Sequence, residues 1–68
     1  MGIEEIQRML LDECGLRVTP EMGEYILASL KVSGTGDVAI IGGDAKTGVP
    51  IRTTIPAADL HGFIAAQS

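Results

Sequence analysis

The sequence predicts an α+β fold, built as two N-terminal helices, a β-hairpin and a short C-terminal helix. The first half of the chain repeats apolar residues at helical spacing, and the second half contains two short runs rich in β-branched residues between glycines. A third apolar stripe at helical spacing follows Pro56. With 68 residues the chain has room for one core, so we expect a single domain spanning residues 1–68.

The first helix is predicted over residues 2–14. Glu4 and Glu5 lie in its first turn, where carboxylates interact favourably with the positive end of the helix dipole. Gly15 follows the helix and is suited to the left-handed conformation that closes many helices. The expected buried stripe consists of Ile3, Ile6, Met9, Leu10, Leu11 and Cys14.

The second helix is predicted from Pro20 to about Val32, after a short connection formed by residues 16–18. Thr19 is placed to cap this helix, because its hydroxyl can accept a bond from a backbone N–H of the first turn. Pro20 suits the first helical position, where the N–H that proline lacks would have no partner. The expected buried face consists of Met22, Tyr25, Ile26, Ser29 and Leu30.

The hairpin is predicted from two strands of different character. Residues 38–41 form a short apolar run, and apolar residues alternate with other types from Val49 to Ile55. Residues 42–48 join the strands as a loop whose glycines adopt positive φ. The helix after Pro56 is short and must dock on the rest of the domain to be stable. Its apolar stripe consists of Ala57, Leu60, Phe63 and Ile64.

The same loop, residues 42–48, has part of the composition of a phosphate-binding loop. Such a loop requires a glycine immediately before its Lys-Ser/Thr pair and a helix after it. Here Ala45 precedes Lys46, and a strand begins at Val49. The pattern therefore favours an ordinary hairpin turn, in which Asp44 and Lys46 are exposed and contribute little to stability. A small ligand-binding module built on this loop is a third alternative for function.

Few side chains in the chain could carry chemistry. Cys14 and His61 are the one cysteine and the one histidine, whereas structural zinc takes four ligands and catalytic zinc takes three plus water. Cys14 lies on the expected apolar stripe, and His61 is expected on the surface of the last helix. We therefore predict no catalytic residues, no metal site and no cofactor, and we expect a protein that is not an enzyme.

The charge balance argues against two classes of partner. The chain has nine acidic and five basic residues, and no two of its cations are adjacent. Proteins that bind nucleic acid or anionic membranes cluster Lys and Arg on one surface. The acidic residues of the two helices are expected on solvated faces. A lone cysteine excludes an internal disulfide framework, and no segment has the pattern of a signal peptide, so we expect a cytoplasmic address.

These observations favour a small, non-catalytic protein-protein interaction or adaptor domain that forms a homodimer. Aliphatic residues are too numerous for a domain of this size to bury them all, and the hairpin is expected to be apolar on both faces. The predicted interaction residues are Ile40, Ile41, Val49, Ile51 and Ile55. The alternative is a DNA-binding regulator, because the order helix, helix, hairpin resembles part of a winged helix. In that alternative Lys46 and Arg52 of the wing contact phosphate.

Overall fold

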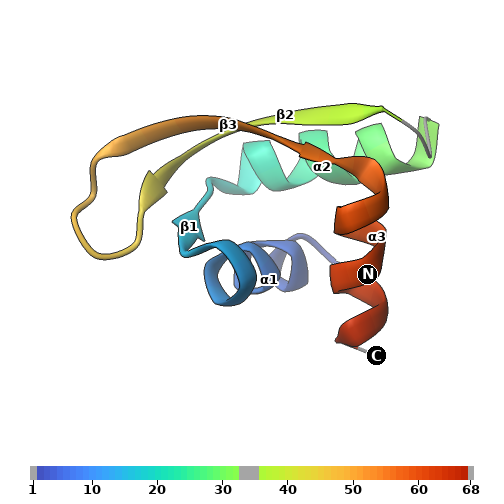
Figure 1. Ribbon diagram of the computed structural model, residues 1–68, viewed down its shortest axis with the longest axis horizontal. Coiled ribbons are helices and arrows are strands. Elements are labelled where there is room, and N and C mark those ends of the chain that lie inside the picture. Colours follow the sequence, from blue (N-terminus) through green and yellow to red (C-terminus); the bar gives the residue numbers. More distant parts are fainter. Residues whose placement is uncertain (1, 33–35, 68) are drawn as a thin grey trace.

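The computed structural model of the protein describes residues 2–32 and 36–67. The two N-terminal helices, the hairpin and the C-terminal helix are confirmed, and one further short strand lies between the first two helices (Figure 1). The elements in chain order are α1 (Ile3–Cys14), β1 (Leu16–Arg17), α2 (Pro20–Val32), β2 (Asp37–Asp44), β3 (Pro50–Pro56) and α3 (Ala57–Ala66).

Both ends of α1 are closed by local hydrogen bonds. At the N-terminus, the backbone N–H of Gly2 donates to the Glu5 carboxylate at 3.0 Å. At the C-terminus, Gly15 has φ 63° and ψ 32°, the left-handed conformation that the sequence predicts. Its N–H donates to the carbonyl of Leu11 at 3.1 Å. The chain can therefore reverse direction directly after α1 and enter β1.

The start of α2 is also as predicted, but its buried face is not. The N–H of Met22 donates to the hydroxyl of Thr19 at 3.2 Å, which confirms the cap. The buried residues of α2 are Gly23, Ile26 and Leu30, whereas Tyr25 is 49% exposed. The prediction that Tyr25 is buried was wrong because α1 packs against Gly23. A Cβ atom at Gly23 would lie 2.9 Å from Cγ2 of Ile3, and this close approach turns the opposite side of α2 to solvent.

The three strands form one antiparallel sheet in the order β1-β2-β3. β1 pairs with the end of β2, Leu16 with Asp44 and Arg17 with Gly43. Residues 42–44 therefore belong to β2, and their prediction as part of the loop was wrong. The physical reason is the glycine at position 42, where a Cβ atom would lie 2.6 Å from the carbonyl oxygen of Arg17. Without a side chain there, β1 can approach closely enough to pair.

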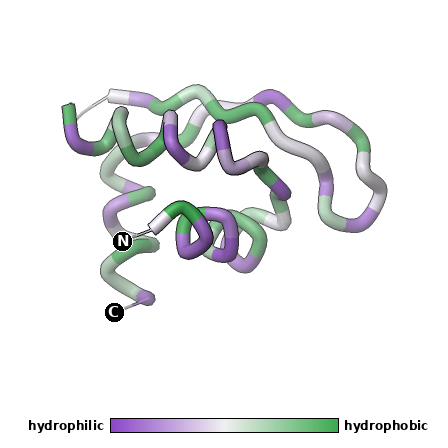
Figure 2. Tube along the Cα trace, turned by 180° about the vertical axis from the view of Figure 1, so that it is seen from behind, coloured by the Kyte–Doolittle hydropathy of each residue, from purple (hydrophilic) through white to green (hydrophobic). Residues whose placement is uncertain are grey.

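All three helices lie on one side of the hairpin (Figure 1). The hydrophilic residues of α1 face away from the sheet (Figure 2), and the polar side of that helix is solvated as expected. The core between the helices and the sheet contains one fully buried isoleucine of β2, Ile40. The buried apolar residues are Ile6, Met9, Leu10, Leu16, Val18, Ile26, Leu30, Val38, Ile40, Ala57 and Leu60.

Candidate functional site

The turn at the tip of the hairpin is organised by the side chain of Asp44. Its carboxylate accepts the backbone N–H of Lys46 at 2.7 Å and of Thr47 at 2.9 Å. The hydrogen bond from Thr47, followed by that from Lys46, lowers the pKa of Asp44 below its ordinary value. Gly48 has φ 76°, as predicted for the loop, whereas Gly42 and Gly43 are extended and do not have positive φ. The carboxylate occupies the N–H groups that a bound phosphate would need.

The five predicted interaction residues fall into three different environments. Ile40 is 0% exposed and belongs to the core of the chain itself, so it is not part of any surface. Ile51 and Ile55 pack against that core and are only partly buried. Ile41 is 53% exposed and Val49 is 57% exposed. The structure thus leaves four of the five residues accessible, two of them to a large extent.

The face of the sheet opposite the helices carries few apolar side chains on β3. On β3 the residues of that face are exposed, and they are Pro50, Arg52, Thr54 and Pro56. Ile51, Thr53 and Ile55 alternate with them and face the helices. On the bare face Ile41 lies opposite Arg52. The period-two alternation predicted for β3 is therefore confirmed, because its isoleucines share one side, and the large apolar side chain on the bare face is Ile41 of β2.

The outer edge of β3 is the longest strand edge that no other described strand covers. Two hydrogen bonds between the strands show which residues of this segment bond to β2. The N–H of Asp44 donates to the carbonyl oxygen of Val49 at 2.9 Å, and the N–H of Ala57 donates to the carbonyl oxygen of Gly36 at 2.8 Å. Bonded pairs alternate in an antiparallel ladder. The backbone groups of residues 51, 53 and 55 therefore bond to β2, and those of residues 50, 52, 54 and 56 face outward.

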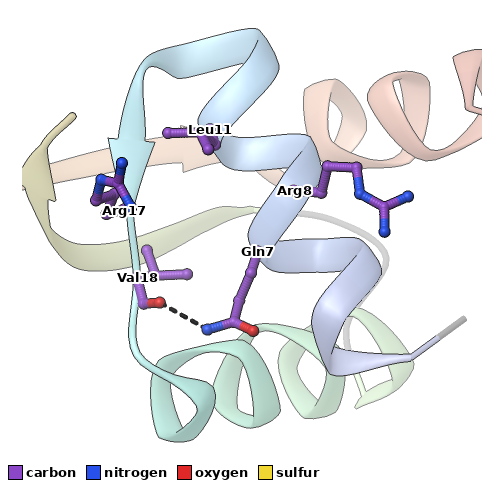
Figure 3. Close-up of a pocket in the computed structure, with 5 residues that line it drawn as sticks. All are labelled: Gln7, Arg8, Leu11, Arg17 and Val18. Carbon is purple, nitrogen blue, oxygen red and sulfur yellow. Dashed lines mark hydrogen bonds between the residues drawn. The ribbon is translucent and has the colours of Figure 1, made fainter. Parts of the chain in front are cut away.

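An open groove of about 480 Å³ lies between α1 and the segment that contains β1. The amide of Gln7 donates to the carbonyl of Val18 at 2.9 Å across this groove (Figure 3). Arg8 and Arg17 also line it, but their guanidinium groups point away from each other and do not converge on one anion. This groove was not predicted, because β1 was not expected as a strand.

The two residues considered for chemistry, Cys14 and His61, belong to different helices, α1 and α3. Cys14 is exposed, so its prediction as a member of the buried stripe was wrong; the stripe of α1 is centred on Ile6, Met9 and Leu10. Partial burial and the neighbouring Glu13 carboxylate raise the pKa of the Cys14 thiol. His61 is exposed on α3, as expected. Over residues 2–32 and 36–67 no three His, Cys, Asp or Glu side chains lie together as metal ligands would.

No family model, no curated protein and no solved structure matches this chain. Within the part of the chain that the structure describes, no helix is both long enough and apolar enough to cross a bilayer.

Proposed function

We propose that the protein is a small, non-catalytic protein-interaction or adaptor domain that forms a homodimer through its hairpin. The observation that supports this most is the incomplete cover of the hairpin by the chain's own helices. Val49 and Ile41 are more than half exposed, and the helix-facing residues of β3 are only partly buried. β3 is an edge strand, and an accessible strand edge with apolar side chains is a template for pairing with another chain.

The chemistry of the candidate nucleophile supports a non-catalytic role. Thiols react as thiolates, and a raised pKa keeps the Cys14 side chain protonated at neutral pH. The single histidine, His61, is on a different helix and exposed to solvent. A free and exposed thiol is also compatible with a reducing compartment, and we propose a cytoplasmic location.

The DNA-binding alternative has weaker support. Lys46 and Arg52 of the hairpin are exposed, as a wing would require. The exposed face of α2, which would have to enter the groove, carries Glu21 and Glu24, and both carboxylates repel phosphate. A titration of labelled duplex DNA at increasing salt separates the two functions. A DNA-binding protein loses affinity for the duplex steeply as salt rises. A protein-interaction domain does not bind the duplex at any salt concentration.

The proposed function is tested by the mass of the protein in solution. We expect sedimentation equilibrium at micromolar concentration to give a mass near twice that of the 7.1 kDa chain, and dilution to reverse the association. A stable, cooperatively folded monomer over the whole accessible concentration range would contradict the proposal. Lys46→Glu at the tip of the turn is the control variant, because its side chain is exposed and its backbone N–H is retained.

A further inference from the structure

We infer that two copies of this chain associate by antiparallel pairing of β3 with β3, with Thr53 of each copy on the twofold axis. This inference rests on the proposed homodimer and specifies the surface that forms it. The twofold axis lies perpendicular to the sheet, so that one continuous sheet passes from one copy to the other. The argument begins with the backbone groups at the outer edge of β3.

The outer edge of β3 offers hydrogen-bond donors only at its centre. The outward-facing positions are 50, 52, 54 and 56, and the first and last are prolines without an N–H. Arg52 and Thr54 each present one N–H and one C=O. Prolines at both ends remove two donors from this edge, which favours a short pairing over a long one.

A twofold axis at Thr53 uses every available donor. Arg52 of one copy then lies opposite Thr54 of the other, and each of these pairs exchanges both of its N–H···O bonds. Pro50 lies opposite Pro56 of the second copy, so the positions without donors meet each other. Four hydrogen bonds result, and no N–H at this edge stays unpaired. An axis at Arg52 also forms bonds, but it places the two Arg52 side chains directly opposite each other, and like charges repel.

The side chains favour the same axis. With Thr53 on the axis, Ile51 of one copy lies opposite Ile55 of the other on the helix-facing side, and the two Thr53 side chains are adjacent. Ile51, Thr53 and Ile55 are the residues of β3 that the chain's own helices cover only in part. The Thr53 hydroxyl has no hydrogen-bond partner among the described residues, and its symmetry mate supplies one. An axis at Thr54 would instead place each Ile55 opposite a threonine.

The exposure of Val49 is explained by the same arrangement. Counting along the strands from the axis places Val49 of one copy opposite Ala57 of the other, the first residue of α3. In Figure 1 the tip of the hairpin extends beyond the helices of its own chain, whereas α3 turns away from the sheet at the opposite end of β3. The second copy therefore brings its α3 next to the uncovered tip, where Val49 is 57% exposed.

Disulfide crosslinking tests the register directly. Three single-cysteine variants, Arg52→Cys, Thr53→Cys and Thr54→Cys, are made in a Cys14→Ser background and oxidised as dimers. Facing residues in a non-bonded antiparallel pair have Cα atoms about 4.5 Å apart, within the range of a disulfide. We expect Thr53→Cys to crosslink nearly completely and the other two variants poorly. Efficient crosslinking through Arg52→Cys or Thr54→Cys instead would overturn the register.

A proline variant tests the edge itself. Thr54→Pro removes one outward N–H from each copy but no bond to β2, so the monomer retains its own ladder. We expect the dissociation constant of the dimer to rise at least about tenfold, and Thr54→Val, which keeps the N–H, to leave it unchanged. A dimer that neither crosslinks through Thr53→Cys nor responds to Thr54→Pro refutes the inference and leaves the homodimer standing. A protein that is monomeric throughout refutes both.

Discussion

β2 and β3 are partners in one hairpin, yet only one of them is built into the core. On β2, Val38 is 4% exposed and Ile40 is 0% exposed. On β3, the residues that face the helices are all partly exposed, although they pair with β2 along its length. The difference arises because α2 packs against β2, whereas β3 is the edge strand of the sheet. Position in the sheet, more than residue type, decides burial here.

The largest expected effect comes from the same truncation on the two strands. Ile40→Ala removes a fully buried side chain, and we expect it to lower the free energy of unfolding by about 2–5 kcal/mol. Ile55→Ala should cost less than half as much in the monomer, because the side chain is only partly buried. Urea unfolding of both variants measures the difference, and equal costs would contradict the comparison. If a second copy of the chain covers β3, the loss of unfolding free energy caused by Ile55→Ala becomes larger as the protein concentration rises.

Two adjacent glycines of β2 provide the next comparison. A methyl group at Gly42 would lie 2.6 Å from the carbonyl oxygen of Arg17, so Gly42→Ala must displace β1. We expect a loss of about 1–3 kcal/mol in the free energy of unfolding. At Gly43 the nearest atoms would lie at an ordinary contact distance, 3.8 Å or more, and Gly43→Ala is the matched control. Thermal unfolding that shows the two variants to be equally stable would mean that β1 does not depend on this close approach.

Gly48 tests the turn that joins the two strands. Its φ of 76° is unfavourable for residues with a side chain, although a Cβ atom there would contact nothing within 4 Å. Backbone strain alone should therefore make Gly48→Ala less stable by about 1–2 kcal/mol. Gly62→Ala, in α3 and also in open space, should instead be neutral or stabilising. Chemical unfolding of both variants checks this, and a neutral Gly48→Ala would show that the turn adopts another conformation.

The smallest expected effect is the pH dependence of the turn. Backbone hydrogen bonds from Thr47 and Lys46 lower the pKa of Asp44 in the folded protein. A lowered folded-state pKa stabilises the fold above the ordinary value of 3.8, and the contribution is lost as the pH falls through the lowered pKa. Asp44→Asn should therefore reduce stability at neutral pH and lose that disadvantage in acid.

A pair of alanine variants completes this test of the turn. Lys46→Ala should have no effect, since Lys46 contributes its backbone N–H and not its side chain to the turn. Asp44→Ala should be the more harmful of the two, against the sequence-based expectation that both positions contribute little. Stability curves of the two variants over pH that coincide with each other would show that the carboxylate does not hold the turn.

Much of the architecture follows from local signals in the sequence. The Thr19-Pro20 start of α2, the left-handed Gly15 after α1 and the period-two alternation of β3 each act within a few residues, and the structure confirms all three. The candidate site was less predictable. Val49, Ile51 and Ile55 were selected as apolar hairpin residues, but their common side depends on the register of β3 against β2. The alternation of Leu16, Arg17 and Val18 is a weak strand signal that could have indicated β1.

The sequence by itself determined the order of the three helices and the hairpin, two helix caps and the positive φ of Gly48, because these depend on backbone preferences and hydrogen bonds between near neighbours. Only the tertiary structure decided which side of each element is buried. Because Gly23 has no side chain, α1 packs closely against that side of α2, and Tyr25 on the opposite side is left exposed to solvent. Because Gly42 has no side chain, β1 lies close enough to β2 to pair with it. In both cases the deciding quantity is the distance between segments remote in the sequence, and no local pattern of residues specifies that distance.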